Sequence, residues 1–238
     1  RPNQISLSLP KTRDVDDGST VSLPCVLAWQ GNERPSEDDP MSGVFEDLLS
    51  EVQKLHDCSV VLQQFGELPE NPEKQMVEPF YIPAASLMET DTDLFTDDFE
   101  TIRDAIITAS PDAHWRETYK GTRIADLFRE RFGCYCLIGK GGPYVADDMA
   151  IYIVYMPKGL YYPFHHHPAE ELYFVLAGEA EFMMKDKPSK TLGPGDHVYH
   201  PSMHPHATQT HDHPFLALVL FKGEIGVTPV LTFPDGDE

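Results

Sequence analysis

Apolar residues in the first 130 positions recur at spacings of three and four, a pattern typical of amphipathic helices. Over residues 41–58 this spacing is met by Val44, Leu48, Val52 and Leu55, which predicts a helix. Helical spacing also occurs over residues 94–107 and 122–132, whereas prolines break the connecting stretch 59–82. Residues 1–40 show little periodicity and are expected to form an irregular or strand-like arm. The region 1–130 is therefore predicted to be mainly helical.

From residue 132 onward, short runs rich in β-branched and aromatic residues replace this pattern. Glycine, proline or charged turns separate the runs at intervals of about ten residues, which is typical of an antiparallel barrel or sandwich. The runs are CYCLIG, MAIYIVYMP, LYFVLAG, EAEFMM, HVYHP and FLALVLFKG. The chain is thus predicted to be mainly β, with a helical region over 1–130 packed on a β-barrel over 131–238.

The charge balance narrows the classes of partner. Acidic residues outnumber basic ones by 39 to 18, for a formal net charge of −21, and this argues against nucleic acid as a partner. An acidic surface fits either a solubility adaptation or attraction of a cationic substrate. No apolar run approaches the roughly 20 residues needed to cross a bilayer, so no membrane span is expected.

The first residues, RPNQISLSLPKTRD, contain no apolar signal-peptide core, although the chain begins at Arg1. The four cysteines include no C-x-x-C pair and suit a reducing compartment. Together these features lead us to expect a cytoplasmic protein.

Histidines are concentrated in two stretches of the predicted barrel, GLYYPFHHHPAEELYFVLAG and GPGDHVYHPSMHPH. In an extended segment His165 and His167 point to one side and His166 to the other. Glu171 follows four residues after His167, where the next strand can return its carboxylate to the same point. Imidazole and carboxylate are the ligands of divalent zinc, iron, manganese, cobalt and nickel, so this pattern predicts a metal site. A fourth ligand would come from the second stretch.

The two stretches resemble the two sequence motifs of the cupin family. The first motif, G-x5-H-x-H-x3-E-x6-G, is matched at every fixed position, by Gly159, His165, His167, Glu171 and Gly178. The second is matched by Gly195, Asp196, Pro201 and His206, whereas Thr210 stands where the family usually has asparagine. The resemblance covers about residues 132–226. It implies a jelly-roll barrel with one divalent transition metal held by His165, His167, Glu171 and His206.

Within the cupins, the chain resembles the dimethylsulfoniopropionate (DMSP) lyases of marine bacteria. The likeness rests on the helical lead-in, on Tyr173 two residues after the glutamate, and on Tyr162 just before the histidines. It implies β-elimination of a small zwitterionic sulfonium substrate, DMSP, to dimethyl sulfide and acrylate. The family includes relatives that act on other substrates. Cupin barrels commonly pair, so the resemblance also leaves a homodimer open.

The residues make chemical sense for this elimination. Tyr173 shares the strand face of Glu171, and a nearby cation can lower the pKa of a phenol, so we predict that Tyr173 is the general base. Tyr162 is predicted to orient substrate or assist proton transfer. Aromatic faces attract a sulfonium cation, and the candidate contacts are Tyr161, Tyr162, Phe182, Tyr199, Phe221 and Trp115, although aromatic residues in such strands are more often plain core than substrate contacts.

Two other readings of the same motifs stay open. One is a different cupin enzyme, such as an Fe(II) dioxygenase or an isomerase. The other is a non-catalytic cupin that binds a small ligand. The sequence does not identify the metal, because a set of three histidines and a glutamate accepts several ions.

Overall fold

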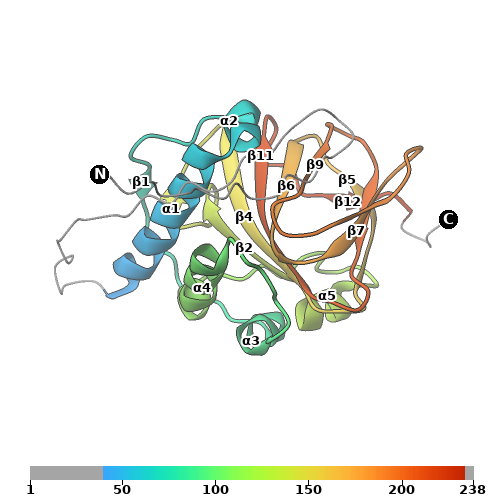
Figure 1. Ribbon diagram of the computed structural model, residues 1–238, viewed down its shortest axis with the longest axis horizontal. Coiled ribbons are helices and arrows are strands. Elements are labelled where there is room, and N and C mark those ends of the chain that lie inside the picture. The colour runs from blue at the N-terminus through green and yellow to red at the C-terminus, as the bar shows by residue number, and fades with distance from the viewer. Residues whose placement is uncertain (1–39, 234–238) are drawn as a thin grey trace, which may run out of the picture.

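A computed structural model describes residues 40–233, and the predicted N-terminal arm lies outside these residues. Helices gather in the first part of the described chain; most of them lie on one side of a barrel of strands, and the last, α5, lies below the barrel in Figure 1. They are α1 (Pro40–Cys58), α2 (Val60–Phe65), α3 (Pro83–Thr90), α4 (Glu100–Ala109), the 3-10 turn η1 (Ser110–Asp112) and α5 (Ala125–Arg131). The predicted mainly β fold with a helical lead-in is confirmed.

The strands form two sheets. The seven-stranded sheet has the order β1-β3-β2-β4-β11-β6-β9 and the five-stranded sheet the order β12-β5-β10-β7-β8. Every pair within them is antiparallel except β2 with β3, and together the sheets make a jelly-roll barrel. The strands are β1 (Glu73–Lys74), β2 (Gly133–Ile138), β3 (Tyr144–Val145), β4 (Met149–Met156), β5 (Tyr161–His166), β6 (Glu170–Gly178), β7 (Ala180–Met184), β8 (Lys190–Leu192), β9 (His197–His200), β10 (His206–Gln209), β11 (Phe215–Lys222) and β12 (Val230–Leu231).

The seven-stranded sheet is buried on both faces, which explains why its central strands are almost continuously apolar. On β6, Leu172 and Phe174 belong to a core shared with the helices, whereas Tyr173 and Val175 belong to the barrel interior. The same alternation places Leu218 of β11 outside and its neighbours inside. One face of this sheet thus anchors the helices, and the other lines the barrel.

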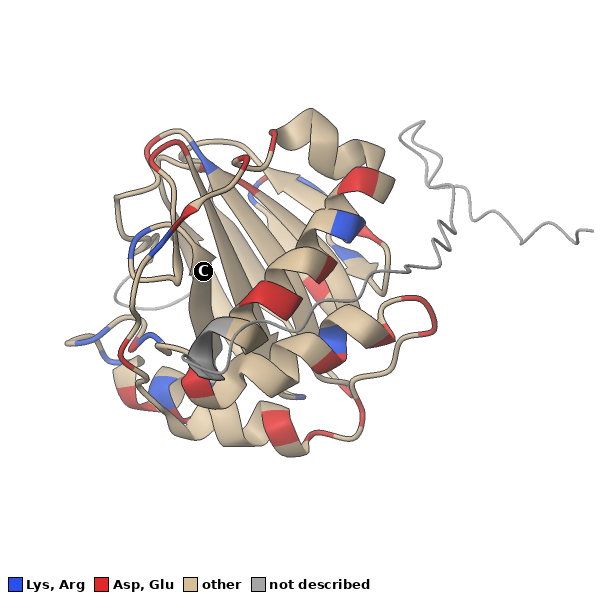
Figure 2. Ribbon diagram, turned by 90° about the vertical axis from the view of Figure 1, so that its left-hand side faces the viewer, with Lys and Arg blue, Asp and Glu red and all other residues tan. Residues whose placement is uncertain are grey.

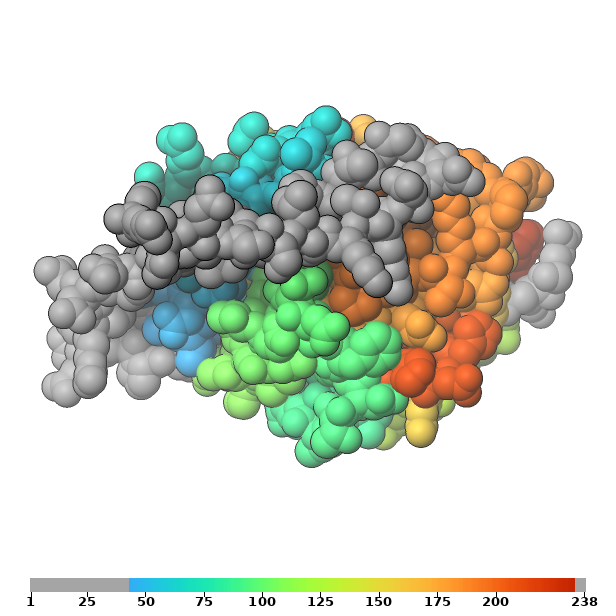
Figure 3. All heavy atoms as spheres, viewed as in Figure 1, coloured from blue at the N-terminus to red at the C-terminus, as the bar shows by residue number. Residues whose placement is uncertain are grey.

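The helices cover the outer face through their apolar sides. Leu48 of α1 and Ile106 of α4 are fully buried against the sheet, and Phe99 meets Phe174 edge to face with ring centroids 5.6 Å apart. Helical and barrel residues lie directly against each other in the space-filling view (Figure 3). Acidic residues are spread along the helices and the loops that join them (Figure 2). None of the described helices has the length and apolar character needed to cross a membrane.

Some element boundaries differ from the sequence prediction. Helix α4 begins at Glu100, so Leu94 and Phe99 precede it although both are buried in the same core. The short helix α3 was not predicted; it begins at Pro83, directly after the proline-broken connecting stretch 59–82. The region predicted as helical also contributes β1, whose two residues pair with β3 at the edge of the large sheet. A strand of two residues is too short to show an alternating pattern in the sequence.

Candidate metal centre and its cavity

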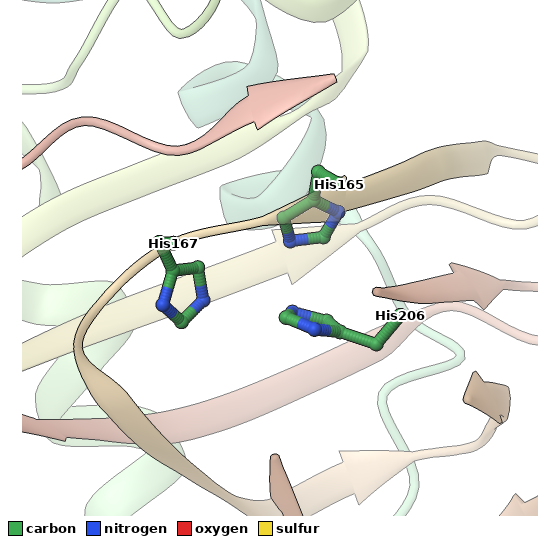
Figure 4. A group of neighbouring side chains, drawn as sticks. All are labelled: His165, His167 and His206. Carbon is green, nitrogen blue, oxygen red and sulfur yellow. The ribbon is translucent and has the colours of Figure 1, made fainter. Parts of the chain in front are cut away.

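The histidine-rich stretch folds so that two neighbouring strands bring imidazoles together. His165 on β5 is directly opposite His206 on β10 in the antiparallel pair, and their ring centroids are 4.2 Å apart. His167 lies just after β5, and its ring is 5.2 Å from that of His206. The three rings converge on one space inside the barrel (Figure 4). His166 faces the other way, with Nδ1 3.0 Å from the hydroxyl of Thr232, as the period of a strand predicts.

Backbone carbonyls fix the orientation and tautomer of these rings. The Nδ1–H of His165 donates to the carbonyl of Pro163 at 2.9 Å, and that of His167 donates to the carbonyl of Ala169 at 2.9 Å. His206 donates in the same way to the carbonyl of His204 at 2.8 Å. A histidine whose Nδ1 carries the proton presents a lone pair at Nε2, and outer hydrogen bonds of this kind orient metal-ligating histidines.

Glu171, the second residue of β6, turns its carboxylate toward the same point. Its Oε2 lies 3.1 Å from Nε2 of His206 and 3.6 Å from Nε2 of His167. Both Nε2 atoms are buried and make no hydrogen bond, so buried polar atoms face one another across these distances without a hydrogen bond between them. Such an arrangement is costly unless a cation joins these atoms. The donor set therefore fits a divalent transition metal.

His200 is a further member of this cluster that the motifs did not assign. It lies on β9 opposite Glu171, and its Nδ1–H donates to Oε2 at 2.7 Å. Its ring stacks on that of His206 with centroids 3.9 Å apart. His200 is completely buried and fixes the direction of the Glu171 carboxylate. Only the pairing of β9 with β6 brings it there, and the sequence carries no signal for that pairing.

Close packing of these groups shifts their pKa values. Burial by itself would raise the pKa of Glu171, but the close imidazoles of His167, His200 and His206 outweigh it and hold that pKa well below the usual range. Burial and the neighbouring His206 lower the pKa of His165 well below its ordinary value. The same causes lower the pKa of His200 to about 4. The pKa of His167 moves the other way: burial would lower it, but contact with the Glu171 carboxylate raises it above the ordinary value. The centre thus places an ionised carboxylate, the form in which it binds metals, among closely packed imidazoles.

A cavity of about 130 Å³ opens beside the histidines inside the barrel. Its wall includes Glu171 and His165, together with Tyr162 and Tyr173. Phe221 also lines it and stacks on His167 with centroids 4.7 Å apart. The cavity is small and has several aromatic side chains in its wall, which suits a small ligand with an apolar or cationic end.

Both tyrosines predicted to be catalytic line this cavity. The ring of Tyr162 lies parallel to that of His165, with centroids 4.0 Å apart, and its hydroxyl is 3.0 Å from the hydroxyl of Tyr119. Tyr173 is buried, and its ring lies 5.7 Å from that of His200. Burial, followed by the charge of Glu171, raises the pKa of Tyr173 well above its ordinary value. Its phenol is therefore protonated unless a cation is held nearby.

The other residues predicted to contact substrate occupy several environments. Phe182 lies inside the barrel beside Tyr173 but does not line the cavity. Tyr161 is half-buried and also lies outside the cavity wall. Tyr199 is exposed and donates its hydroxyl to Glu170 at 2.6 Å.

Trp115 is fully buried in the core on the outer face of the large sheet, where its indole N–H donates to the carbonyl of Ser110 at 3.0 Å. This placement favours a packing role, because the tryptophan has both an apolar environment and a partner for its donor. Tyr119 and Arg116 do line the cavity and were not predicted to do so. Both come from the irregular segment before α5, for which the sequence gives no periodic pattern.

Comparison with known proteins gives one consistent family. The model of the dimethylsulfoniopropionate lyase family matches residues 56–217. The dimethylsulfoniopropionate lyase DddQ of Ruegeria pomeroyi is 55% identical over 202 residues, which cover 85% of this chain and 99% of that protein.

Solved structures agree with this match. The crystal structure of the DMSP lyase DddQ from Ruegeria pomeroyi superposes with a TM-score of 0.81 at 56% identity, over 82% of this chain and 99% of that one. A chain from the crystal structures of the DMSP lyases RdDddP and RnDddQII gives a TM-score of 0.76 at 29% identity, over 81% of this chain and 99% of that one.

Proposed function

The chain belongs to the dimethylsulfoniopropionate lyase family, and from that premise we propose that it cleaves DMSP to dimethyl sulfide and acrylate with a bound divalent metal and a tyrosine base. The observation that carries the proposal is the close facing of two buried polar atoms without a hydrogen bond, Nε2 of His206 and Oε2 of Glu171, 3.1 Å apart beside a tyrosine-lined cavity. His165, His167, Glu171 and His206 would hold the ion. His200 would keep the carboxylate of Glu171 turned toward it.

Elimination requires a base for the proton on the carbon next to the substrate carboxylate. The chemistry that a divalent cation supplies when bound is withdrawal of charge from that carboxylate and a lower pKa for a neighbouring phenol. Tyr173 takes the proton as its phenolate. The electron pair of the broken C–H bond forms the new double bond, and the pair of the C–S bond leaves with sulfur. The products are acrylate and neutral dimethyl sulfide, and the proton stays on Tyr173.

Tyr162 has a different part in this proposal. Its ring is held parallel to His165, and its hydroxyl is fixed by Tyr119, so it presents an ordered polar group at the wall of the cavity. Such a group can orient the substrate or pass on the proton. The aromatic surfaces of Phe221 and the tyrosines face the cavity, where they would stabilise a sulfonium cation.

The test is turnover of DMSP by the purified protein loaded in turn with Zn, Fe(II), Mn, Co and Ni. Headspace dimethyl sulfide should appear together with an equal amount of acrylate. Absence of both products with every metal would exclude the proposed reaction. Oxygen consumption, or activity restricted to Fe(II), would instead indicate a dioxygenase.

A further inference from the structure

A second hollow of about 500 Å³ adjoins the metal cavity. It extends outward past His114 and Lys140, both exposed, and reaches solvent. The two hollows share part of their walls, so they meet at a junction. The residues common to both walls are Arg116, Glu117, Tyr152, Ile225, Gly226 and Thr228. A small molecule that moves between solvent and the metal centre along this route passes Arg116.

Arg116 is a half-buried cation at that junction. Its backbone N–H donates to the carbonyl of Cys134 at 2.8 Å, which ties the segment to β2. Its guanidinium lies over the ring of Tyr152, 5.0 Å from the centroid. Among the residues that the structure describes, no carboxylate lies within ion-pair distance of this guanidinium. The guanidinium is therefore held against the ring of Tyr152, and no carboxylate among the described residues neutralises its charge.

The acidic residue beside it does not supply the missing charge. The carboxylate of Glu117 is paired with Lys120 at 2.7 Å and approaches Arg129 at 3.8 Å. Both of these cations lie on the solvent side of the segment and are largely exposed. A partly dehydrated guanidinium without a counter-ion costs free energy, and this cost is recovered when an anion binds.

The chemistry of the side chain indicates which anion. A guanidinium presents a planar fork of donors that matches the two oxygens of a carboxylate. The protein as a whole carries a net charge of −21 and repels anions, so a cation at the mouth has a local role that the overall field does not provide. Lys140 adds a second positive charge to the outer hollow.

We infer that Arg116 is a carboxylate-binding residue at the mouth of the metal cavity. It binds the carboxylate of the substrate on the way in and that of the acrylate product on the way out. The identity of these two carboxylates rests on the proposed function, whereas binding of a small carboxylate at Arg116 does not.

The test compares two ligands of nearly equal size, acrylate and uncharged acrylamide, titrated calorimetrically into the metal-loaded protein. Hydrogen bonds to charged partners are worth enough that Arg116→Gln should weaken acrylate binding about 10- to 100-fold. Acrylamide binding should not change. Arg116→Lys keeps the charge but loses the fork, so its acrylate affinity should lie in between.

Arg123→Gln is the matched control, because Arg123 is exposed on the same segment and lines neither hollow. It makes the same change in net charge and should leave acrylate binding as in the wild type. Metal content and thermal unfolding of each variant show whether the fold and the metal centre are intact. If Arg116→Gln does not fold, the Lys variant carries the comparison.

Measuring DMSP turnover beside acrylate affinity distinguishes failure of the Arg116 inference from failure of the proposed lyase function. With DMSP as substrate, Arg116→Gln should raise KM with little change in kcat, because contact at the mouth acts on binding. Unchanged acrylate affinity in a folded, metal-loaded Arg116→Gln protein would overturn the inference even if dimethyl sulfide is formed. If wild-type protein forms no dimethyl sulfide but its acrylate binding depends on Arg116, the proposed function fails and the inference stands.

Discussion

Replacing Tyr173 by phenylalanine removes one hydroxyl, and the structure gives separate expectations for stability and for activity. The ring of Tyr173 packs against Phe182 and Phe215, and phenylalanine keeps both contacts. The hydroxyl group faces the cavity and makes no hydrogen bond to other described residues. The loss of unfolding free energy should therefore be less than about 1 kcal/mol. Turnover should fall by about 10² to 10⁴-fold, the usual contribution of a general base.

Tyr155→Phe is the matched control, because it removes a tyrosine hydroxyl from the other face of the same sheet. Tyr155 is buried against the helices, and its hydroxyl donates to Oδ2 of Asp91 at 2.7 Å. Loss of a hydrogen bond to a charged acceptor should lower the unfolding free energy by about 1.5–3 kcal/mol, while activity below the melting temperature is kept. Tyr173→Phe should thus lose activity and keep its stability, whereas Tyr155→Phe should lose stability and keep its activity.

The assay combines headspace dimethyl sulfide, acrylate by chromatography, metal content and urea denaturation for both variants. The decisive quantity is the activity of metal-replete Tyr173→Phe. If it keeps more than about a tenth of wild-type turnover, the base assignment is wrong, since a positioned base contributes at least ~10²-fold. If the variant loses its metal, Tyr173 acts as a ligand and the loss of activity says nothing about proton transfer.

Three further predictions concern the metal centre and its scaffold. Chelation should lower the melting temperature, and restoring metal at a hundred times its Kd should return about 2.7 kcal/mol; an unchanged melting curve would contradict the facing of Glu171 and His206 as an ion site. In metal-free protein, stability should fall as pH drops from about 6.5 toward 4, because burial lowers the pKa of His200 to about 4 and the unfolded chain takes up the proton first. The loss should reach at most about 3 kcal/mol by urea denaturation, and His200→Asn should reduce this slope. Gly178→Ala should destabilise the protein by at least about 2 kcal/mol more than Gly159→Ala, since both glycines have positive φ but only at 178 would a Cβ lie 1.9 Å from a backbone oxygen; equal melting temperatures would exclude this explanation.

Local spacing was enough to find most of the centre. His165, His167 and Glu171 lie within seven positions, and a strand, a turn and a strand place them on one side whatever the rest of the chain does. His206 could be predicted because the second motif places a histidine at a fixed distance after its glycine turn. Likewise, the helical spacing of 41–58 predicted α1 to within one residue of its first position. In each case the spacing of residues close together in the sequence is enough for the prediction.

The remaining parts of the site depend on contacts between distant segments, which periodicity does not encode. His200 reaches Glu171 through pairing of β9 with β6, and Tyr119 reaches Tyr162 across 43 positions. Arg116 and Trp115 are adjacent in sequence, yet one lines the metal cavity and the other lies in the outer core. The sequence by itself determined the barrel and predicted the candidate ligands, since both follow from local patterns. Which aromatic and charged residues surround the candidate ligands was decided only by tertiary packing. Both faces of the large sheet are buried and carry apolar side chains, so the sequence alone does not tell which face lines the cavity.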